Sequence, residues 1–126
     1  MMAKVNEYLK LHHITGAQLY VLMLLWENEG REMTQKQMYN VMEIKPPSLT
    51  KLIIQLEKKG YISRKTNPED KRYSIIMLTR TGTQLRGRTL EFADEFNGKL
   101  FNGISDDEVA TMKTVIMKLQ ENLSKM

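Results

Sequence analysis

The stretch PPSLTKLIIQLEKKGYISRKTNPEDKRYSIIML (residues 46–78) contains the signals of a helix followed at once by a β-hairpin. Its two prolines suit the first turn of a helix, where no amide partner is lost, and Gly60 supplies the left-handed residue that commonly ends one. The runs 61–66 and 73–78 are rich in β-branched and aromatic residues and are bounded by turn formers, which is typical of strands. We therefore predict a helix that ends just before Gly60, then a hairpin with NPEDKR at its tip.

The predicted helix, from Pro47 to about Lys59, has two different faces. Four side chains recur at helical spacing and are expected to face the core: Leu49, Leu52, Ile53 and Leu56. The other side is polar and basic apart from one isoleucine, and it comprises Pro47, Ser48, Thr50, Lys51, Ile54, Gln55 and Lys58.

A shorter helix is predicted upstream, from Gln35 to about Met42. It begins with a capping box, in which the Thr34 side chain accepts from the third helical amide while Gln37 reaches back to the cap amide. We expect this helix to present three apolar side chains to the core, namely Met38, Val41 and Met42. Two short helices joined by a few residues, the second with a polar and basic outer face, describe a helix-turn-helix. The hairpin that follows makes it a winged helix-turn-helix.

The same capping chemistry precedes the helix-turn-helix, where Thr15 and Gln18 open another helix. This helix runs from Gly16 to about Glu29 and is apolar nearly all round, so we predict that it is the central core helix. Gly30 is expected to end it.

Two long helices are predicted for the last third, residues 79–101 and 106–124, and a capping box of Ser105 with Glu108 opens the second. The second helix carries an apolar seam of the kind that packs against other helices, formed by Val109, Met112, Ile116, Leu119 and Leu123. Little of the chain is left to cover this seam. A second copy is therefore the expected partner, together with the amphipathic N-terminal segment that contains Val5, Leu9 and Leu11.

The basic excess of the chain is confined to its middle. From Arg31 to Arg72, ten Lys or Arg residues stand against five Asp or Glu, a balance of +5, whereas the whole chain has a net charge of +4. One face is thus expected to meet a polyanion, and a solvated charged surface is the alternative interpretation.

Composition and motifs argue against several classes of protein. The chain has no cysteine, no glycine-rich phosphate loop, no metal-spaced histidine cluster and no carboxylate pair in an evident pocket, so we expect no enzyme, cofactor or metal site. It also lacks an apolar run of 18 residues, and its start, MMAKVNEYLK, lacks the apolar core of a signal peptide. A cytoplasmic protein without a membrane segment is expected.

The run TQKQMYNVMEIKPPSLTKLIIQLEKKGYISRKTNPEDKRYSIIMLTRTG (34–82) resembles the MarR family of bacterial and archaeal transcriptional regulators. Its most specific parts are LIIQLEKKGYISR, NPEDKR and LTRTG. The resemblance implies a mainly α fold with a small β-hairpin wing, in one domain over 1–126. The DNA-binding lobe would span about 30–80, and dimerisation helices would lie at about 1–14 and 83–126. The function implied is regulation of transcription, as a repressor, by a homodimer that binds double-stranded DNA sequence-specifically.

The resemblance also assigns roles to residues of the wing. Arg72 would enter the minor groove beside Lys71, Asp70 would hold it in position, and Arg64 would be the second cation. An ordinary surface salt bridge between Asp70 and Arg72 is the alternative. Phosphates would be met where amides and the helix dipole favour an anion, at Thr34, Gln35 and Lys36. The outer face of the helix from Pro47 to Lys59 would read the bases, unless it is simply a solvated face.

Many members of the family bind small aromatic acids between the dimer helices and the DNA-binding lobe. In this chain such an effector site would be lined by Tyr8, His12, His13 and Arg86, but two adjacent histidines near a helix end are more often surface or packing residues. Only about 14 residues precede the core helix, fewer than is usual in the family, so the dimer interface is expected to be built differently. The alternative function is that of a winged-helix interaction module whose basic face meets an acidic protein partner.

Overall fold

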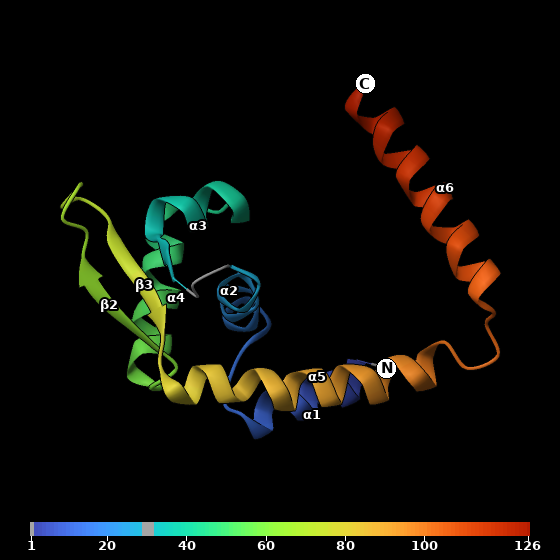
Figure 1. Ribbon diagram of the computed structural model, residues 1–126, viewed down its shortest axis with the longest axis horizontal. Coiled ribbons are helices and arrows are strands. Elements are labelled where there is room, and N and C mark those ends of the chain that lie inside the picture. Colours follow the sequence, from blue (N-terminus) through green and yellow to red (C-terminus); the bar gives the residue numbers. More distant parts are fainter. Residues whose placement is uncertain (1, 29–31) are drawn as a thin grey trace. The chain divides into compact units, whose positions relative to one another are not determined.

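The chain divides after Phe92 into two units, Met1–Phe92 and Ala93–Met126. The computed structural model describes residues 2–28 and 32–126. As predicted, the fold is mainly helical with a small antiparallel sheet (Figure 1). The elements are α1 (Met2–Leu11), α2 (Gly16–Glu27), β1 (Glu32–Thr34), α3 (Gln35–Met42), α4 (Pro46–Lys58), β2 (Ile62–Thr66), β3 (Ser74–Leu78), α5 (Arg80–Leu100) and α6 (Asp106–Ser124). None of the helices in the described ranges is long and apolar enough to cross a membrane.

All three predicted capping boxes are present. At the start of α2, the Thr15 hydroxyl accepts from the Gln18 amide at 3.2 Å and the Gln18 side chain accepts from the Thr15 amide at 3.1 Å. The same reciprocal pair of bonds opens α3 and α6. Because these bonds link residues only three apart, the sequence alone was enough to place the helix starts.

The helix α2 lies at the centre of the first unit, as predicted, and Val21, Leu22 and Leu25 have no exposed surface. The inner face of α4 covers it with Leu49, Ile53 and Leu56, also fully buried. Removing this much apolar surface from water is the main force that holds α4 in place. The helix α2 ends at Glu27, about two residues before the predicted end, and Gly30 lies outside the described residues.

The expected core face of α3 is only partly correct. Met38 is fully buried and Met42 packs against the core, but Val41 is 52% exposed. Successive residues are about 100° apart around a helix, so Val41 and Met42 lie on opposite sides of Met38. The core contacts the side that carries Met42, and the prediction that Val41 faces the core is therefore wrong.

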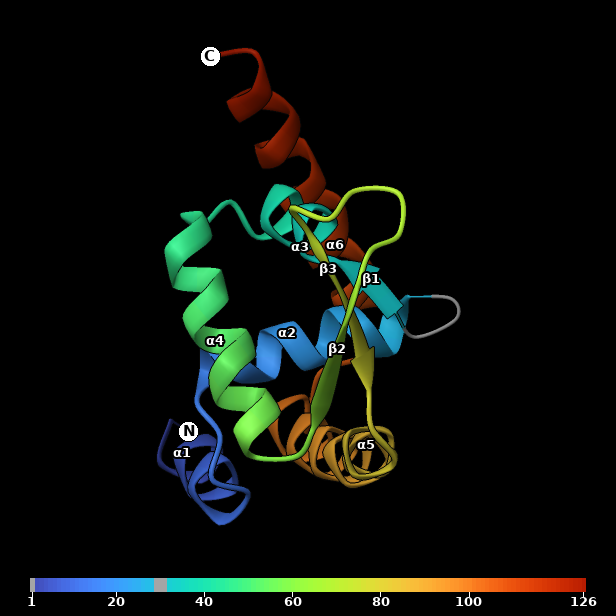
Figure 2. The same cartoon turned by 90° about the vertical axis from the view of Figure 1, so that its left-hand side faces the viewer.

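The predicted hairpin is formed by β2 and β3, and β1 adds a third strand that the sequence analysis missed. β3 is central, with β1 and β2 antiparallel on either side of it. β1 runs directly into α3, and Thr34 pairs with Ile75 of β3. The sheet therefore places the start of α3 beside the wing, as Figure 2 shows.

The junction between the wing and α5 is tightly packed around Gly82. The Trp26 indole N–H donates to the Gly82 carbonyl at 2.9 Å, and the Thr79 amide donates to the Tyr61 carbonyl at 3.0 Å. A Cβ atom on Gly82 would lie 2.1 Å from the Tyr61 oxygen. Glycine is therefore needed here for close approach of the backbones rather than for an unusual φ.

Candidate nucleic-acid interface

Three segments of the first unit meet on one part of its surface: the start of α3, the start of α4 and the hairpin tip. The Gln35 side-chain amide donates to the Thr50 hydroxyl at 2.8 Å, which links α3 to α4. The Lys36 ammonium lies 5.6 Å from the centre of the Tyr73 ring, which links α3 to the wing. These contacts connect the three segments into one continuous surface.

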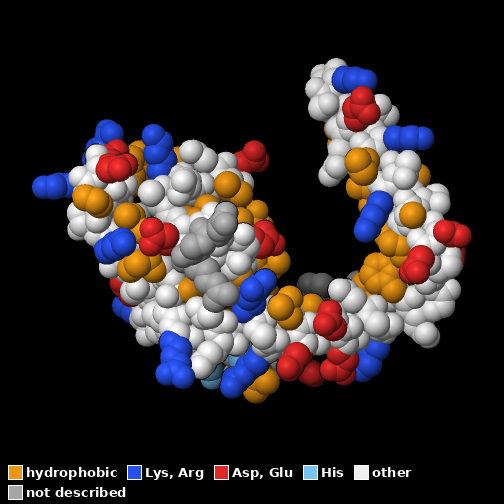
Figure 3. All heavy atoms as spheres, viewed as in Figure 1, with side chains coloured by type: hydrophobic (Ala, Val, Ile, Leu, Met, Phe, Trp, Pro, Cys, Tyr) orange, Lys and Arg blue, Asp and Glu red, His pale blue; other side chains and the backbone are white. Residues whose placement is uncertain are grey.

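Cations project from this surface. Lys36, Lys51, Lys71 and Arg72 are exposed in these segments, as are Pro47 and Ser48, whereas Lys58 is exposed at the far end of α4. Figure 3 shows Lys and Arg side chains projecting from the region of the hairpin tip and α3, with acidic groups among them. The N-terminus of α3, with its amide groups and helix dipole, adds positive potential at Thr34, Gln35 and Lys36.

The hairpin tip is folded by its own side chains. The Asn67 side-chain oxygen accepts from the Glu69 amide at 3.0 Å, as expected of a turn-forming asparagine. The Asp70 carboxylate accepts from Arg72 Nε at 3.0 Å and from Arg72 Nη2 at 3.1 Å. The Arg72 side chain is nevertheless 80% exposed, so it is oriented by Asp70 and still available to a partner.

Two charge effects accompany this pair. Hydrogen bonds from the Arg72 side chain, and then from its amide, hold the pKa of the Asp70 carboxyl below its usual value. The same carboxylate raises the pKa of the Arg72 guanidinium. The pair is therefore fully ionised near neutral pH.

The structure places Arg64 differently from the other cations. Its guanidinium forms two hydrogen bonds to the Glu57 carboxylate, at 3.0 and 3.1 Å. Both side chains remain about one third exposed. The Arg64 guanidinium, which the resemblance assigns to DNA as the second cation, is thus already paired within the lobe.

Gln55 is also set apart from the predicted base-reading residues. It is half-buried near the end of α4, and its side-chain oxygen accepts from the side-chain amide of Gln18 at 2.9 Å. Gln18 is 2% exposed and also accepts from the Lys59 ammonium at 2.7 Å. Gln55 therefore belongs to a network beneath α4, and the exposed residues near the start of α4 are better placed to reach a ligand.

The sequence analysis missed two tyrosines in this region, Tyr39 and Tyr73. Their hydroxyl oxygens are 3.4 Å apart, and their rings lie 6.2 Å apart at a 45° tilt. Tyr39 follows Lys36 by about one turn of α3, and Tyr73 directly follows Arg72. The sequence signal that could have identified them is the presence of aromatic residues next to cationic residues in the predicted DNA-binding segments.

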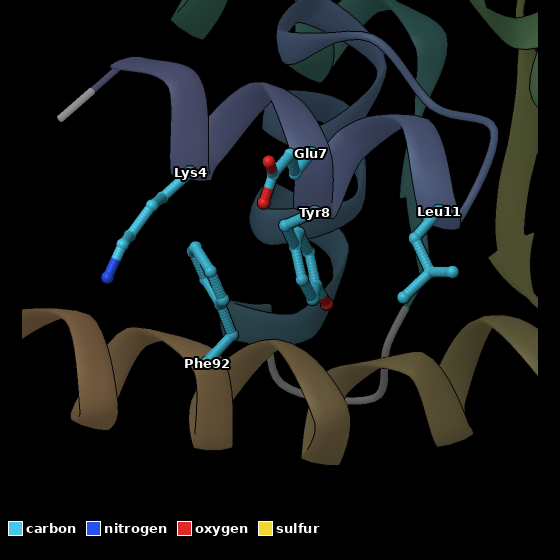
Figure 4. Close-up of a pocket in the computed structure, with 5 residues that line it drawn as sticks. All are labelled: Lys4, Glu7, Tyr8, Leu11 and Phe92. Carbon is cyan, nitrogen blue, oxygen red and sulfur yellow. The ribbon is translucent and has the colours of Figure 1, made fainter.

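The residues predicted to bind an effector fall into different surroundings. Tyr8 is buried, its hydroxyl lies 2.6 Å from the Thr89 hydroxyl, and its ring stacks on Phe92 at 4.3 Å. Burial raises the pKa of Tyr8. The two rings line an open cavity of about 270 Å³ between α1 and α5, together with Lys4, Glu7 and Leu11 (Figure 4).

His12 lines a separate cavity of about 110 Å³, with Tyr61, Thr81, Gln84, Leu85 and Arg88. Burial and then the charge of Arg88 lower the pKa of His12. The other two predicted residues, His13 and Arg86, line neither of these cavities. His13 is exposed, and Arg88 rather than Arg86 lines the cavity beside His12. The carbonyl of His13 accepts a hydrogen bond from Lys59.

Comparison with known proteins agrees with this geometry. The MarR family model matches residues 14–73. A Staphylococcus aureus MepR–DNA complex is 27% identical over 98% of this chain and 91% of that chain, with a TM-score of 0.71. A mutant MarR from E. coli complexed with operator DNA is 28% identical over 93% of this chain and 83% of that chain, with a TM-score of 0.78.

The fold alone is matched by a MarR transcriptional regulator from Methanosarcina mazei Go1, with a TM-score of 0.81. It is 21% identical over 98% of this chain and 88% of that chain. The family match, the solved structures and the winged helix-turn-helix with its basic surface agree with one another. Through the family match over residues 14–73 and the DNA complexes that cover more than nine tenths of it, this chain is similar to MarR family transcription regulators.

Proposed function

We propose that the protein represses transcription by binding a specific double-stranded DNA site as a homodimer. The observation that carries this proposal is the chain of contacts from Thr50 through Gln35 and Lys36 to Tyr73, which joins α4, α3 and the wing into one basic surface. Two similar proteins have been solved in complex with DNA, which supports DNA binding by this chain.

Each segment suits a different part of the duplex. The start of α3 would hold a phosphate with its amides and Lys36, because a helix N-terminus favours an anion. The exposed residues at the start of α4, among them Ser48 and Lys51, would face base edges in the major groove. Arg72 would enter the adjacent minor groove, where a narrow A·T-rich groove concentrates negative potential.

The homodimer is supported by exposed apolar side chains in both units. The α6 seam includes Met112, Ile116, Leu119 and Leu123, which are 44% to 68% exposed. In the first unit, Leu11 is 73% exposed beside the Tyr8–Phe92 cavity. A row of exposed apolar side chains along one helix is typical of an interaction site, and the regular seam of α6 suits another helix of the same kind.

We also propose that a small carboxylic acid regulates the protein from the cavity beside His12. Arg88 supplies a cation, Thr81 and Gln84 supply polar groups, and Leu85 supplies an apolar wall. This combination suits a small anion with an apolar body. Binding of a panel of small aromatic acids to native protein and to Arg88→Gln, measured by calorimetry, tests this site. Equal binding by both proteins would contradict it.

Selection of bound fragments from a random duplex pool tests the proposed DNA binding. We expect a near-palindromic site with half-sites about one helical turn apart, and affinity that falls steeply with salt because counterions are released. Lys51→Ala should weaken binding to the selected site by about tenfold or more, and less on random DNA. The control is Lys118→Ala, which loses the same charge outside the three segments. Binding to acidic proteins, without salt-dependent DNA binding, would support an interaction module instead.

A further inference from the structure

Tyr73 contacts two cations that come from different elements. The Lys36 ammonium, in the first turn of α3, lies 5.6 Å from the centre of the Tyr73 ring, and the Arg72 guanidinium carbon lies 5.7 Å from it. Both distances are within the range of about 6 Å at which a cation is attracted to an aromatic face. The ring therefore lies where the helix-turn-helix and the wing tip meet.

Tyr39 gives this junction a second point of contact. It lies three residues after Lys36, so both side chains project from the same side of α3. Its hydroxyl lies 3.4 Å from the Tyr73 hydroxyl, and its ring is 6.2 Å from the Tyr73 ring. α3 thus touches Tyr73 at both the ring face and the hydroxyl.

The wing tip lies beyond the strand ladder. The last paired residues of the hairpin are Thr66 and Ser74, so Arg72 belongs to the unpaired loop. Within that loop, Asp70 orients the Arg72 side chain and the Asp70 carbonyl accepts from the Tyr73 amide at 3.1 Å. Asp70 fixes the arginine relative to the loop, and Tyr73 connects the loop to α3.

We propose that Tyr73 is a positioning residue that fixes Arg72 relative to Lys36. The wing arginine and the phosphate-facing lysine would then contact the duplex at a fixed distance from each other. This inference rests on the proposed DNA binding and extends it to a residue that need not touch DNA. Ordering long cationic side chains and a loop on binding costs entropy, and contacts already present in the free protein reduce that cost.

The same contacts make the two cations interdependent. Lys36→Ala would remove a phosphate contact and also one of the groups that hold Tyr73. Arg72 would then be positioned less well and would contribute less to binding. Once Arg72 is absent, only the first of these losses remains. The combined substitution should therefore weaken binding less than the product of the two single effects.

The test is a set of double-mutant cycles with one fixed duplex, measured by equilibrium fluorescence anisotropy. Lys36→Ala, Arg72→Ala and their combination are compared in three backgrounds: native, Tyr73→Phe and Tyr73→Leu. We expect the cycle to deviate from additivity by about threefold or more in the native protein. Tyr73→Phe retains the ring and should retain the coupling, whereas Tyr73→Leu should make the two effects additive. Tyr73→Val, whose β-branched side chain is compatible with the extended backbone next to β3, serves as a second ring-free variant.

Two results would overturn the inference and leave DNA binding intact. One is additivity in the native background. The other is coupling that persists unchanged in Tyr73→Leu and Tyr73→Val, since it would then pass through the DNA or directly between the cations. Failure of the native protein to bind any duplex in a salt-dependent manner would instead contradict the proposed function. Circular dichroism of every variant confirms that losses of affinity do not reflect unfolding.

Discussion

Asp70 accepts three hydrogen bonds from Arg72, two from the guanidinium and one from the backbone amide, at distances of 3.0 to 3.1 Å. The arginine is thereby held by a carboxylate that itself lies on the proposed DNA-binding surface. An acid at such a position repels the DNA phosphates, but it also orients the arginine that contacts DNA. The two effects predict opposite results for its removal.

We predict that Asp70→Asn weakens DNA binding, although it makes the protein more basic. Arg72→Ala should weaken binding by about tenfold or more and flatten any preference for A·T-rich flanks. The double substitution should lose little beyond Arg72→Ala alone, because coupled residues are not additive. Anisotropy titrations on one selected site measure all three. Tighter binding by Asp70→Asn, with additive effects, would reduce the pair to an ordinary surface salt bridge.

The pKa of Asp70 gives an independent measure of the same pair. Because Arg72 lowers this pKa in the folded protein, the pair stabilises the fold above the usual aspartate value near 3.8 and loses that effect as pH falls through the lower folded value. A carboxyl NMR titration of the folded protein should show a low midpoint for Asp70, and Arg72→Ala should raise it. Glu108 is the internal control, since Ser105 lowers its pKa and Arg72→Ala should leave it unchanged.

The junction at Gly82 provides a prediction about stability. A methyl group there would meet the Tyr61 carbonyl oxygen, whereas a methyl group on Gly87 in the same helix would have no neighbouring atom within 4 Å. We expect Gly82→Ala to lower the free energy of unfolding by about 1 to 3 kcal/mol through overpacking. Gly87→Ala should raise it by about 0.5 to 1 kcal/mol, the gain of alanine in an exposed helix. Urea unfolding of both variants is the measurement. A similar increase in the free energy of unfolding for both would show that the junction has room for a methyl group.

Gln18 and Gln37 occupy the same position in two capping boxes but have different surroundings. Gln18 is buried and also bonds Gln55 and Lys59, whereas Gln37 is exposed. Gln18→Leu should cost about 1 to 3 kcal/mol, because buried partners lose their hydrogen bonds. Gln37→Leu should cost less than about 1 kcal/mol, since water can replace its cap interaction. Equal shifts in urea unfolding would contradict the importance of the buried network.

The features that the sequence predicted correctly depend on neighbours along the chain. The capping boxes, the inner face of α4, the left-handed Gly60 and the hairpin are encoded within a few residues each. The strand β1 is only three residues long and exists because it pairs with β3, about forty residues later. No local pattern distinguishes such a strand from a loop.

The site was predictable to a similar degree and for the same reason. The resemblance carried by NPEDKR implied the Asp70–Arg72 pair, and the two residues are only two positions apart in the hairpin loop. The pairing of Arg64 with Glu57, the burial of Gln55 against Gln18 and the place of Arg88 beside His12 all depend on how separate elements approach one another. Tyr73 was assigned to a strand, and its role became visible only once α3 lay beside the wing.

The last prediction concerns the oligomer. Leu119 lies in the exposed apolar seam of α6, so a charge there would be buried without a partner if a second copy covers the seam. Sedimentation equilibrium at micromolar concentration should give about twice the chain mass of 14.7 kDa for the native protein and a shift toward monomer for Leu119→Asp. The neighbouring Gln120→Asp introduces the same charge outside the seam and should remain dimeric. Many such dimers have no stable folded protomer, so loss of the Leu119→Asp fold at equal concentration is also an expected outcome. A monomeric native protein, or equal behaviour of the two variants, would show that the seam does not form the dimer.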